Sequence, residues 1–382
     1  MKISVIVPGR LHGFDMALYF QKVGLLNELV TGYPKKYVIT FGIEERLVKS
    51  LYINEIINRI TNWLGLGYPL DFIACELFDY LASKFIKLDS DVYFIWSGYA
   101  LRTIKNIREK NQKAKIILVR GSAHIEEQNR LLEEINFSKQ SKINRNIIAK
   151  ELKEYEAADY ITIPSTFAYN TFIEKGFTNE KLFLNFLGVN LSEFPFSYKD
   201  TNNSKIVIGY VGTMSRRKRV DSIIDVLAKL NKEDNRFELK LIGPIDYKTF
   251  DESLLKQHEF VCYRRAVEQN KLHLIYKEID IFVLNSIEDG FGMVLLQAMS
   301  CGCPIIASAN SGGPDVIDQY KNGIVIPPSN NHELKKAFQW FYENKNLIAV
   351  MGFESRKLSE NGFTWDDFGK RNISFIKQIL KN

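Results

Sequence analysis

The turn Gly290–Gly292 has the residues that an anion-binding site needs. Glu288 and Asp289 precede it, and the apolar segment Met293–Ser300 follows it. Glycine lets a backbone approach a ligand closely. The first amides of a helix that begins after the turn would point at the turn, together with the positive end of the helix dipole. Carboxylates beside such a site suit a ligand that carries hydroxyl groups next to its phosphates, such as a nucleotide sugar.

Two features of this stretch have structural alternatives. Glu288 and Asp289 could simply cap the helix, since acidic side chains are favoured at helix starts. Gln297 is a lone amide within the apolar segment, and it needs a hydrogen-bond partner if it is buried. That partner could be a ligand or a neighbouring loop.

A cationic cluster follows Lys205–Gly212, which is an apolar run expected to form a strand. The cluster spans Thr213–Val220 with the sequence TMSRRKRV, and a helix is expected over Asp221–Leu230. Lysine binds phosphate as a point charge, whereas arginine grips it through two parallel hydrogen bonds. The cluster could therefore hold a diphosphate, or it could be solvated surface.

Polar turns end two further expected strands. Ile3–Val7 leads into a turn with Arg10 and His12, and Ile116–Val119 leads into a turn that ends at His124. Ligands of open α/β sheets bind beyond the carboxyl ends of the strands, so these side chains are candidates for substrate contact. The first turn could instead be a solvated loop, and His124 could cap the helix after it.

The elements that must position these residues alternate between strand and helix. Ile281–Leu284 and Ile305–Ala307 are short apolar runs typical of buried strands, and they flank the segment Met293–Ser300. Cys301–Pro304 should end that helix, as glycine and proline do. This order predicts a βαβ unit of a parallel sheet. The opening strand Ile3–Val7 is of Rossmann type, but the chain has no GxGxxG, which argues against a nicotinamide site.

Composition limits the class of protein. The 382 residues suffice for two domains. The net charge of +6 and the pI near 8.8 suit anionic ligands or an anionic membrane surface. This charge is too weak to indicate nucleic-acid binding, and no nucleic-acid motif is present. We see no signal peptide before the first strand and no apolar run near the ~20 residues of a spanning helix, so a cytoplasmic location is expected.

The four cysteines favour a reducing cytoplasm over a disulfide framework. Cys301 and Cys303 have no matching His or Cys pair nearby, which argues against a zinc site. We therefore expect no metal site.

Residues 281–328 resemble the donor-site signature of glycosyltransferase family 4, a family of retaining enzymes with the GT-B fold. The family pattern is Glu, Gly-Phe-Gly and a second Glu eight residues after the first. Asp289 stands at the first position and Gln297 at the second, so both depart from the pattern. In the family the first acid contacts hydroxyls of the donor sugar and the second holds the ribose hydroxyls. Aspartate is a shorter acid, and glutamine can still hydrogen-bond a ribose. The match continues through AM-x-CG-x-P, GG-x-x-x-x-I and G-x-x-x-PP.

The resemblance also assigns roles to the cationic turn and to the first domain. In the family an Arg and a Lys of this turn clamp the donor diphosphate. Lys218 matches the Lys, Thr213 stands where the Arg would be, and Arg217 is the preferred replacement. A functional His near the transferred sugar is matched by His124. The expected catalytic residues are His124, Lys218 and Asp289; the expected donor-binding residues are Thr213, Arg217, Lys218, Asp289, Gly290, Phe291, Gly292, Met293, Val294 and Gln297; and Arg10 and His12 are expected on the acceptor side.

The implied fold class is α/β, with two Rossmann-like domains whose parallel sheets face each other across a cleft. Residues 1–195 would bind the acceptor, residues 205–360 would bind the nucleotide sugar, and residues 363–382 would form a helix that crosses back to the first domain. An amphipathic helix is expected over Ile43–Ile60. In relatives with lipid-linked acceptors this region touches the membrane, and its basic and aromatic side chains suit an anionic interface. A packed surface helix fits the same pattern.

The implied activity is that of a hexosyltransferase-like enzyme. It would transfer a sugar from a nucleotide-diphosphate donor to a hydroxyl acceptor with retention, using no cofactor and no metal. The acceptor would be a glycan or a lipid-linked glycan of surface polysaccharide or lipopolysaccharide assembly, and the protein would be cytoplasmic or peripheral on the inner face of the membrane. Two alternatives stay open: another GT-B activity such as a sugar-nucleotide epimerase, and a non-catalytic partner that binds a nucleotide sugar.

Overall fold

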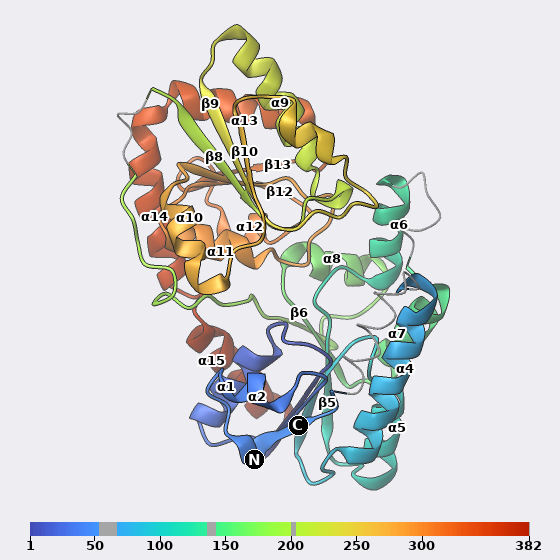
Figure 1. Ribbon diagram of the computed structural model, residues 1–382. Coiled ribbons are helices and arrows are strands. Elements are labelled where there is room, and N and C mark those ends of the chain that lie inside the picture. Colours follow the sequence, from blue (N-terminus) through green and yellow to red (C-terminus); the bar gives the residue numbers. More distant parts are fainter. Residues whose placement is uncertain (53–66, 136–142, 200–203, 382) are drawn as a thin grey trace. The chain divides into compact units, whose positions relative to one another are not determined.

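The computed structural model describes the chain except residues 53–66, 136–142, 200–203 and 382, and for residues 67–71 and 135 it describes the backbone alone. The chain divides into two compact units, whose elements are labelled in Figure 1. Unit 1 comprises Met1–Pro164, Thr171–Asn185 and Trp365–Asn382. Unit 2 comprises Ser165–Asn170 and Phe186–Thr364.

In the described part of unit 1, parallel strands form a sheet in the order β3-β2-β1-β4-β5-β6-β7. Every residue of β1 and of β4 is buried, as expected for strands covered by helices on both faces. Helices α4, α5 and α7 pack side by side along this unit (Figure 1). The strands are β1 (Ile3–Val7), β2 (Leu26–Thr31), β3 (Val48–Ser50), β4 (Val92–Trp96), β5 (Lys115–Val119), β6 (Tyr160–Ile163) and β7 (Leu182–Leu184). The helices are α1 (Gly13–Lys22), α2 (Lys35–Ile39), α4 (Gly67–Phe85), α5 (Leu101–Lys110), α6 (Ile125–Ile135), α7 (Arg145–Ala157), α8 (Thr166–Glu174, whose first turn belongs to unit 2) and α15 (Trp365–Ile379).

In the described part of unit 2, a second parallel sheet has the order β10-β9-β8-β11-β12-β13. Helices α9 and α13 pack against each other beside it (Figure 1). The strands are β8 (Ile206–Val211), β9 (Phe237–Ile242), β10 (Val261–Arg264), β11 (Ile281–Leu284), β12 (Ile305–Ser308) and β13 (Gly323–Ile326). The helices are α9 (Val220–Glu233), α10 (Leu272–Lys277), α11 (Met293–Ser300), α12 (Gly313–Val316), α13 (Asn331–Glu343) and α14 (Ile348–Glu360).

The two parallel sheets with interleaved helices confirm the expected pair of Rossmann-like domains. In the described part of the chain, no helix is both long and apolar enough to cross a bilayer.

The helix predicted over Ile43–Ile60 is wrong in its described half. Glu45–Leu47 is a short 3-10 helix, and the residues after it form β3. This strand pairs in parallel with β2, from Leu29↔Val48 to Thr31↔Ser50. Pairing at the sheet edge therefore overrides the helical spacing of the apolar residues. The second half of the predicted helix lies outside the described residues.

The passage from unit 1 to unit 2 comes at Phe186, earlier than the expected boundary after residue 195. The chain after it is held by unit 2: Val189 pairs with Thr364. The Ser197 amide donates to the Cys301 carbonyl at 3.3 Å. Trp365–Asn382, which include α15, belong to unit 1.

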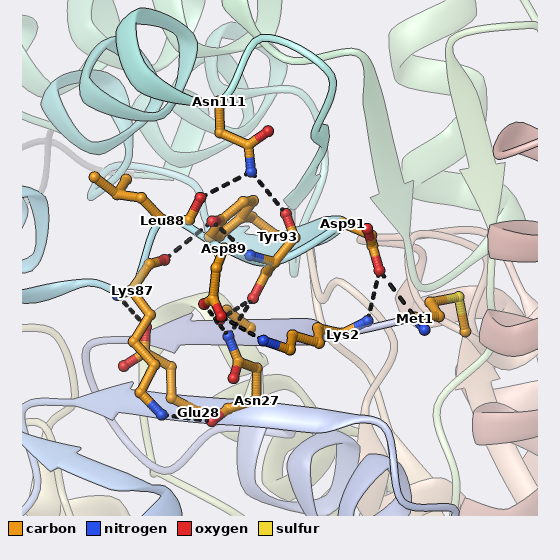
Figure 2. A network of polar contacts seen from close by, with 12 residues as sticks. Met1, Lys2, Asn27, Glu28, Lys87, Leu88, Asp89, Asp91, Tyr93 and Asn111 are labelled. Carbon is orange, nitrogen blue, oxygen red and sulfur yellow. Dashed lines mark hydrogen bonds and ion pairs between the residues drawn. The ribbon is translucent and has the colours of Figure 1, made fainter.

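A polar network ties together the amino ends of the strands of unit 1 (Figure 2). The backbone amide of Lys2 donates to the Asp91 carboxylate at 2.7 Å, just before β1 and β4 begin. The Tyr93 hydroxyl donates to the Lys87 carbonyl at 3.0 Å and accepts from the Ser90 amide at 3.1 Å. These contacts give hydrogen-bond partners to polar groups in the loops at the amino end of the sheet. α/β proteins bind their ligands at the opposite, carboxyl end.

Candidate functional site

The switch point of the unit 2 sheet lies between β8 and β11. These strands pair in parallel through Ile281↔Ile208. The chain continues from β8 to β9 on one side and from β11 to β12 on the other. Loops that leave neighbouring strands in opposite directions create a crevice at the carboxyl ends, where α/β folds bind their ligands.

The loops after β8 and β11 are joined by two ion pairs and a backbone bond. Lys218 Nζ contacts Asp289 Oδ2. Arg217 Nη1 lies 3.2 Å from Glu288 Oε2 and donates to the Glu288 carbonyl at 3.0 Å. The Ile287 amide donates to the Arg217 carbonyl at 2.9 Å. The structure thus brings together Lys218, Arg217 and Asp289, which were predicted for the donor site, and adds Glu288 to them.

The charge on Asp289 is favoured by its surroundings. Burial acts to raise the pKa of Asp289, but the cations of Lys218 and Arg217 outweigh burial and hold that pKa below its ordinary value. Tyr210, in β8, donates its hydroxyl hydrogen to the Thr213 carbonyl at 2.9 Å. Burial, and to a lesser degree the negative charge of Asp289, raise the pKa of Tyr210, which keeps its hydroxyl a donor.

Two glycines allow the backbone to pass where a side chain would collide. Gly292, at the start of α11, has a φ of 82°, and a Cβ there would lie 2.5 Å from Leu284 Cδ2. A Cβ on Gly243, at the end of β9, would lie 2.0 Å from the Gly212 carbonyl oxygen. Only glycine fits these two positions without displacing the site.

The N-terminus of α11 faces the turn Gly290–Gly292, as expected. Gly292 is the N-cap residue and accepts from the Leu295 amide at 2.8 Å, so the amides of Met293 and Val294 stand where a helix offers no internal partner. Phe291 has a structural role in the turn. Its side chain is buried, and its carbonyl accepts from the Gly312 amide at 2.8 Å, which braces the turn against the loop after β12.

Gln297 has a protein partner on α10. Its Oε1 accepts from the Tyr276 hydroxyl at 3.0 Å, and both side chains are buried. Of the two alternatives for this amide, a structural partner is therefore present, although only one end of the amide is used.

The other residues of the cationic turn make different contacts. Thr213 is exposed and contributes its carbonyl to Tyr210. Arg219 has a φ of 53° and donates to Asn331 Oδ1 at 2.8 Å, which fastens the start of α9 to α13. Arg217 is the arginine of this turn that reaches the acids after β11.

His124 does not have the environment of a substrate contact. It is 2% exposed, and the rings of Tyr155, Phe172 and Phe177 lie 5.1, 5.0 and 5.8 Å from it, centroid to centroid. Its Nδ1 accepts from the Glu126 amide at 3.4 Å. Burial lowers the pKa of His124 to about 4. The geometry supports the alternative in which this side chain caps the following helix.

Of the two acceptor-side candidates, His12 is enclosed and Arg10 is not. The His12 ring packs 4.9 Å from Trp96 and 6.0 Å from Phe368, and burial lowers the pKa of His12 to about 4. Arg10 is half-buried, with its Cζ 4.3 Å from the centre of the Phe41 ring. Only the arginine keeps a group that could reach a ligand.

Sequence reasoning missed a buried carboxylate in unit 1. Glu154 accepts from the amides of Gly98 at 2.5 Å, Ala100 at 2.8 Å and Leu101 at 3.1 Å, at the start of α5. Burial, with the nearby charge of Glu151, raises the pKa of Glu154 to about 8. The Glu154 side chain thus occupies the N-terminus of α5. This helix follows β4, which lies next to β1 where the strand order of the unit 1 sheet reverses. No signal in the charged segment 145–157 separated this residue from its exposed neighbours.

Cys301 and Cys303 are buried thiols within the fold. Cys303 Sγ donates to the Tyr276 carbonyl at 3.4 Å, and burial raises the pKa of both thiols. Among the described residues, no group of three His, Cys, Asp or Glu side chains is placed to hold a metal ion.

A groove of about 560 Å³ lies at the other end of the unit 2 sheet, and none of the predicted site residues line it. Its walls come from the end of α9, the outer face of β9 and the residues before β8 and β10, among them Lys205, Glu238 and Phe260. The candidate site is therefore the one at the carboxyl ends of β8 and β11.

Comparison with known proteins links this geometry to sugar transfer. Residues 194–361 match the family model described as glycosyl transferases group 1. The chain is 24% identical over 332 residues to an uncharacterized glycosyltransferase, MJ1069, of Methanocaldococcus jannaschii, covering 82% of this chain and 81% of that protein. It is 23% identical over 189 residues to the capsular polysaccharide biosynthesis glycosyltransferase CapM of Staphylococcus aureus, covering 47% and 49%.

Solved structures agree on the fold. Sucrose-phosphate synthase of Thermosynechococcus elongatus aligns over 100% of both chains with a TM-score of 0.72 and 16% identity. Alr3699/HepE of Anabaena, solved in complex with UDP, aligns over 99% of this chain and 100% of its own with a TM-score of 0.68 and 14% identity. These likenesses confirm the GT-B fold class.

Proposed function

We propose that this chain, whose residues 194–361 match the family model of glycosyl transferases group 1, moves a sugar from a nucleotide-diphosphate donor to a hydroxyl acceptor with retention at the anomeric carbon. The observation that carries the proposal is the junction of Lys218 and Arg217 with Asp289 and Glu288 at the switch point of unit 2.

The donor diphosphate would bind between the cationic turn and the start of α11. Lys218 and Arg217 supply positive charge, and the free amides of Met293 and Val294 add hydrogen-bond donors. Negative charge develops on the diphosphate as the bond to the sugar breaks, so these groups would stabilise the transition state. No metal is required in this proposal, because fixed cations and amides take that role.

Asp289 would bind the sugar rather than attack it. Its ionised carboxylate, adjacent to Glu288 and engaged by Lys218, can accept hydrogen bonds from sugar hydroxyls. Glycosidases place their two carboxylates on opposite sides of the scissile bond, whereas these two are consecutive in the chain and each is paired with a cation. The arrangement favours transfer over hydrolysis and needs no covalent intermediate.

The acceptor is proposed to be a glycan or a lipid-linked glycan of polysaccharide assembly, in line with the name of the Staphylococcus aureus relative. We also propose contact with an anionic membrane surface through the exposed basic residues of unit 1. Lys36 lies 5.1 Å from the Tyr37 ring, and Lys49 lies 5.0 Å from the Phe85 ring. Co-sedimentation with phosphatidylglycerol vesicles should fall when Lys36 and Lys49 are changed to glutamate. Equal sedimentation of variant and parent would refute the membrane contact.

The first experiment is a thermal-shift panel with UDP, GDP, ADP and their common sugar conjugates. A ligand that binds the folded state alone raises the melting temperature by mass action. We expect one nucleotide to stand out, with UDP as the first candidate because the Anabaena structure holds it. The shift should disappear in Lys218→Ala and persist in Lys229→Ala, which changes an exposed lysine of α9 that pairs with Asp225.

Product analysis then separates the remaining functions. A transferase releases the nucleotide diphosphate and extends the acceptor, whereas an epimerase changes the donor sugar without an acceptor. Nucleotide binding with no product on any acceptor would favour the non-catalytic alternative. No shift with any nucleotide would refute the donor site itself.

A further inference from the structure

One end of the Gln297 amide is committed and the other is open. Oε1 accepts from the Tyr276 hydroxyl at 3.0 Å. Nε2 has no hydrogen-bond partner among the described residues, and the residue keeps 8% of its surface exposed. The open end of the amide therefore carries two N–H donors, while Oε1 is turned toward the buried Tyr276 hydroxyl.

Tyr276 determines which end of the Gln297 amide remains open. Its side chain is fully buried, and Gln297 is the only partner of its hydroxyl among the described residues. If the amide were turned around, Nε2 would donate to the hydroxyl, and the phenol hydrogen would be buried without an acceptor. A buried donor without an acceptor is unfavourable. The orientation with Oε1 toward Tyr276 is thus the one in which every buried group is satisfied.

The open N–H groups lie along the expected path of the ligand. Met293 and Gln297 are four residues apart on α11, so they lie on the same face about 6 Å apart along the axis. A diphosphate at the start of the helix would carry its ribose about that far along the same face. This step rests on the proposed donor site.

We propose that Tyr276 is a positioning residue that makes Gln297 a hydrogen-bond donor to the ribose. The site would then need a ribose oxygen that accepts a hydrogen bond, and would not need the hydroxyl hydrogen on that oxygen. A carboxylate at the same position would do the opposite, because it only accepts. The pair would thus set which ribose modifications the enzyme tolerates.

The test measures the affinity of UDP and of its 2′- and 3′-deoxy and O-methyl forms by titration calorimetry. An ether oxygen accepts but cannot donate, and a deoxy position does neither. At one of the two positions the ether should bind the parent protein about fivefold more tightly than the deoxy form, which is the effect of one hydrogen bond. If another nucleotide stands out in the thermal-shift panel, its analogues replace those of UDP.

Two variants make the test specific. Glutamate has the same shape as glutamine but only accepts hydrogen bonds. In Gln297→Glu the ether should therefore bind no better than the deoxy form. The methyl group has the same bulk in both experiments, so its steric effect cancels when the variant is compared with the parent protein. In Tyr276→Phe the amide can rotate, and the preference for the ether should shrink to less than twofold. Tyr93→Phe, a buried tyrosine of unit 1 with its own carbonyl partner, should leave the preference unchanged. Gln297→Glu decides alone if Tyr276→Phe does not fold.

The outcomes separate the two proposals. If the parent binds UDP but does not prefer an ether to a deoxy form, or if Gln297→Glu keeps the preference, the role of the pair is wrong and the donor site stands. If the parent binds none of the nucleotides, the donor site is wrong and this inference is wrong with it.

Discussion

Lys218 and Asp289 form an ion pair across two loops that are 71 residues apart in the chain. The contact joins the carboxyl ends of β8 and β11, and both side chains are largely buried, at 12% and 18% exposure. Without a ligand, the lysine compensates the acid. In the proposed donor complex, the same ammonium would share its hydrogen bonds between the acid and a phosphate.

Lys218→Ala should lower kcat/KM by about 100-fold or more, since it removes a fixed cation from the site where negative charge develops. Initial-rate measurements over a range of donor concentrations give the value. Lys229→Ala is the matched control, because that lysine is exposed and pairs with Asp225 on its own helix. Equal kinetics of Lys218→Ala and the parent would show that the ion pair is structural.

Arg217→Ala should weaken nucleotide binding by roughly tenfold, and Glu288→Gln should weaken it by a smaller factor, because Glu288 acts by holding the guanidinium. The double variant should be no weaker than Arg217→Ala alone, since residues that act through one contact are not additive. Calorimetric titration of the three variants with nucleotide measures this. Arg216→Ala serves for comparison. If it costs more affinity than Arg217→Ala, the wrong arginine has been assigned.

His124 should make the free energy of unfolding depend on pH without affecting the pH dependence of catalysis. Burial lowers its pKa from 6.5 to about 4 in the folded protein, so the folded state favours the neutral ring. That stability is complete above pH 6.5 and is lost as the pH falls toward 4. Between pH 8 and pH 5 the loss from this residue is about 2 kcal/mol.

Denaturant unfolding of the parent and of His124→Asn at these two pH values isolates the contribution. The variant should lose less stability than the parent on acidification. His332→Asn, which changes a side chain that is 73% exposed, should behave like the parent. A pH–rate profile that loses an ionisation near neutrality in His124→Asn would instead support the catalytic role that the sequence suggested.

Gly292→Ala should destabilise the protein by about 2 kcal/mol or more, because the added methyl group lies 2.5 Å from Leu284 Cδ2 and φ is positive. It should also weaken nucleotide binding, since the turn before α11 must move. Denaturation midpoints and calorimetric titration measure the two effects. Gly121→Ala is the control, because a Cβ there meets nothing within 4 Å. Equal stability of the two variants would contradict the tight packing of the turn.

Local rules in the sequence determined the elements around the site. The helix Met293–Ser300 has the bounds that were predicted, because a glycine turn precedes it and Gly302 and Pro304 follow it. The parallel arrangement of the strands also followed from the alternation of short apolar runs with helical segments. The candidate cations and acids stand out by residue type and by their positions after strands, but their donor-site roles came from the resemblance to glycosyltransferase family 4.

Tertiary structure decided which of these residues meet. Lys218 reaches Asp289 because β11 lies beside β8 in the sheet. The order of strands in a sheet cannot be deduced from the sequence of either segment alone. His124 is enclosed by rings from α7, α8 and Phe177, so its burial depends on packing over more than 50 residues of chain rather than on its own turn. Val48–Ser50 became a strand because β2 offered an open edge. Sequence spacing describes one element at a time, whereas the charge state and accessibility of a side chain depend on the elements packed around it.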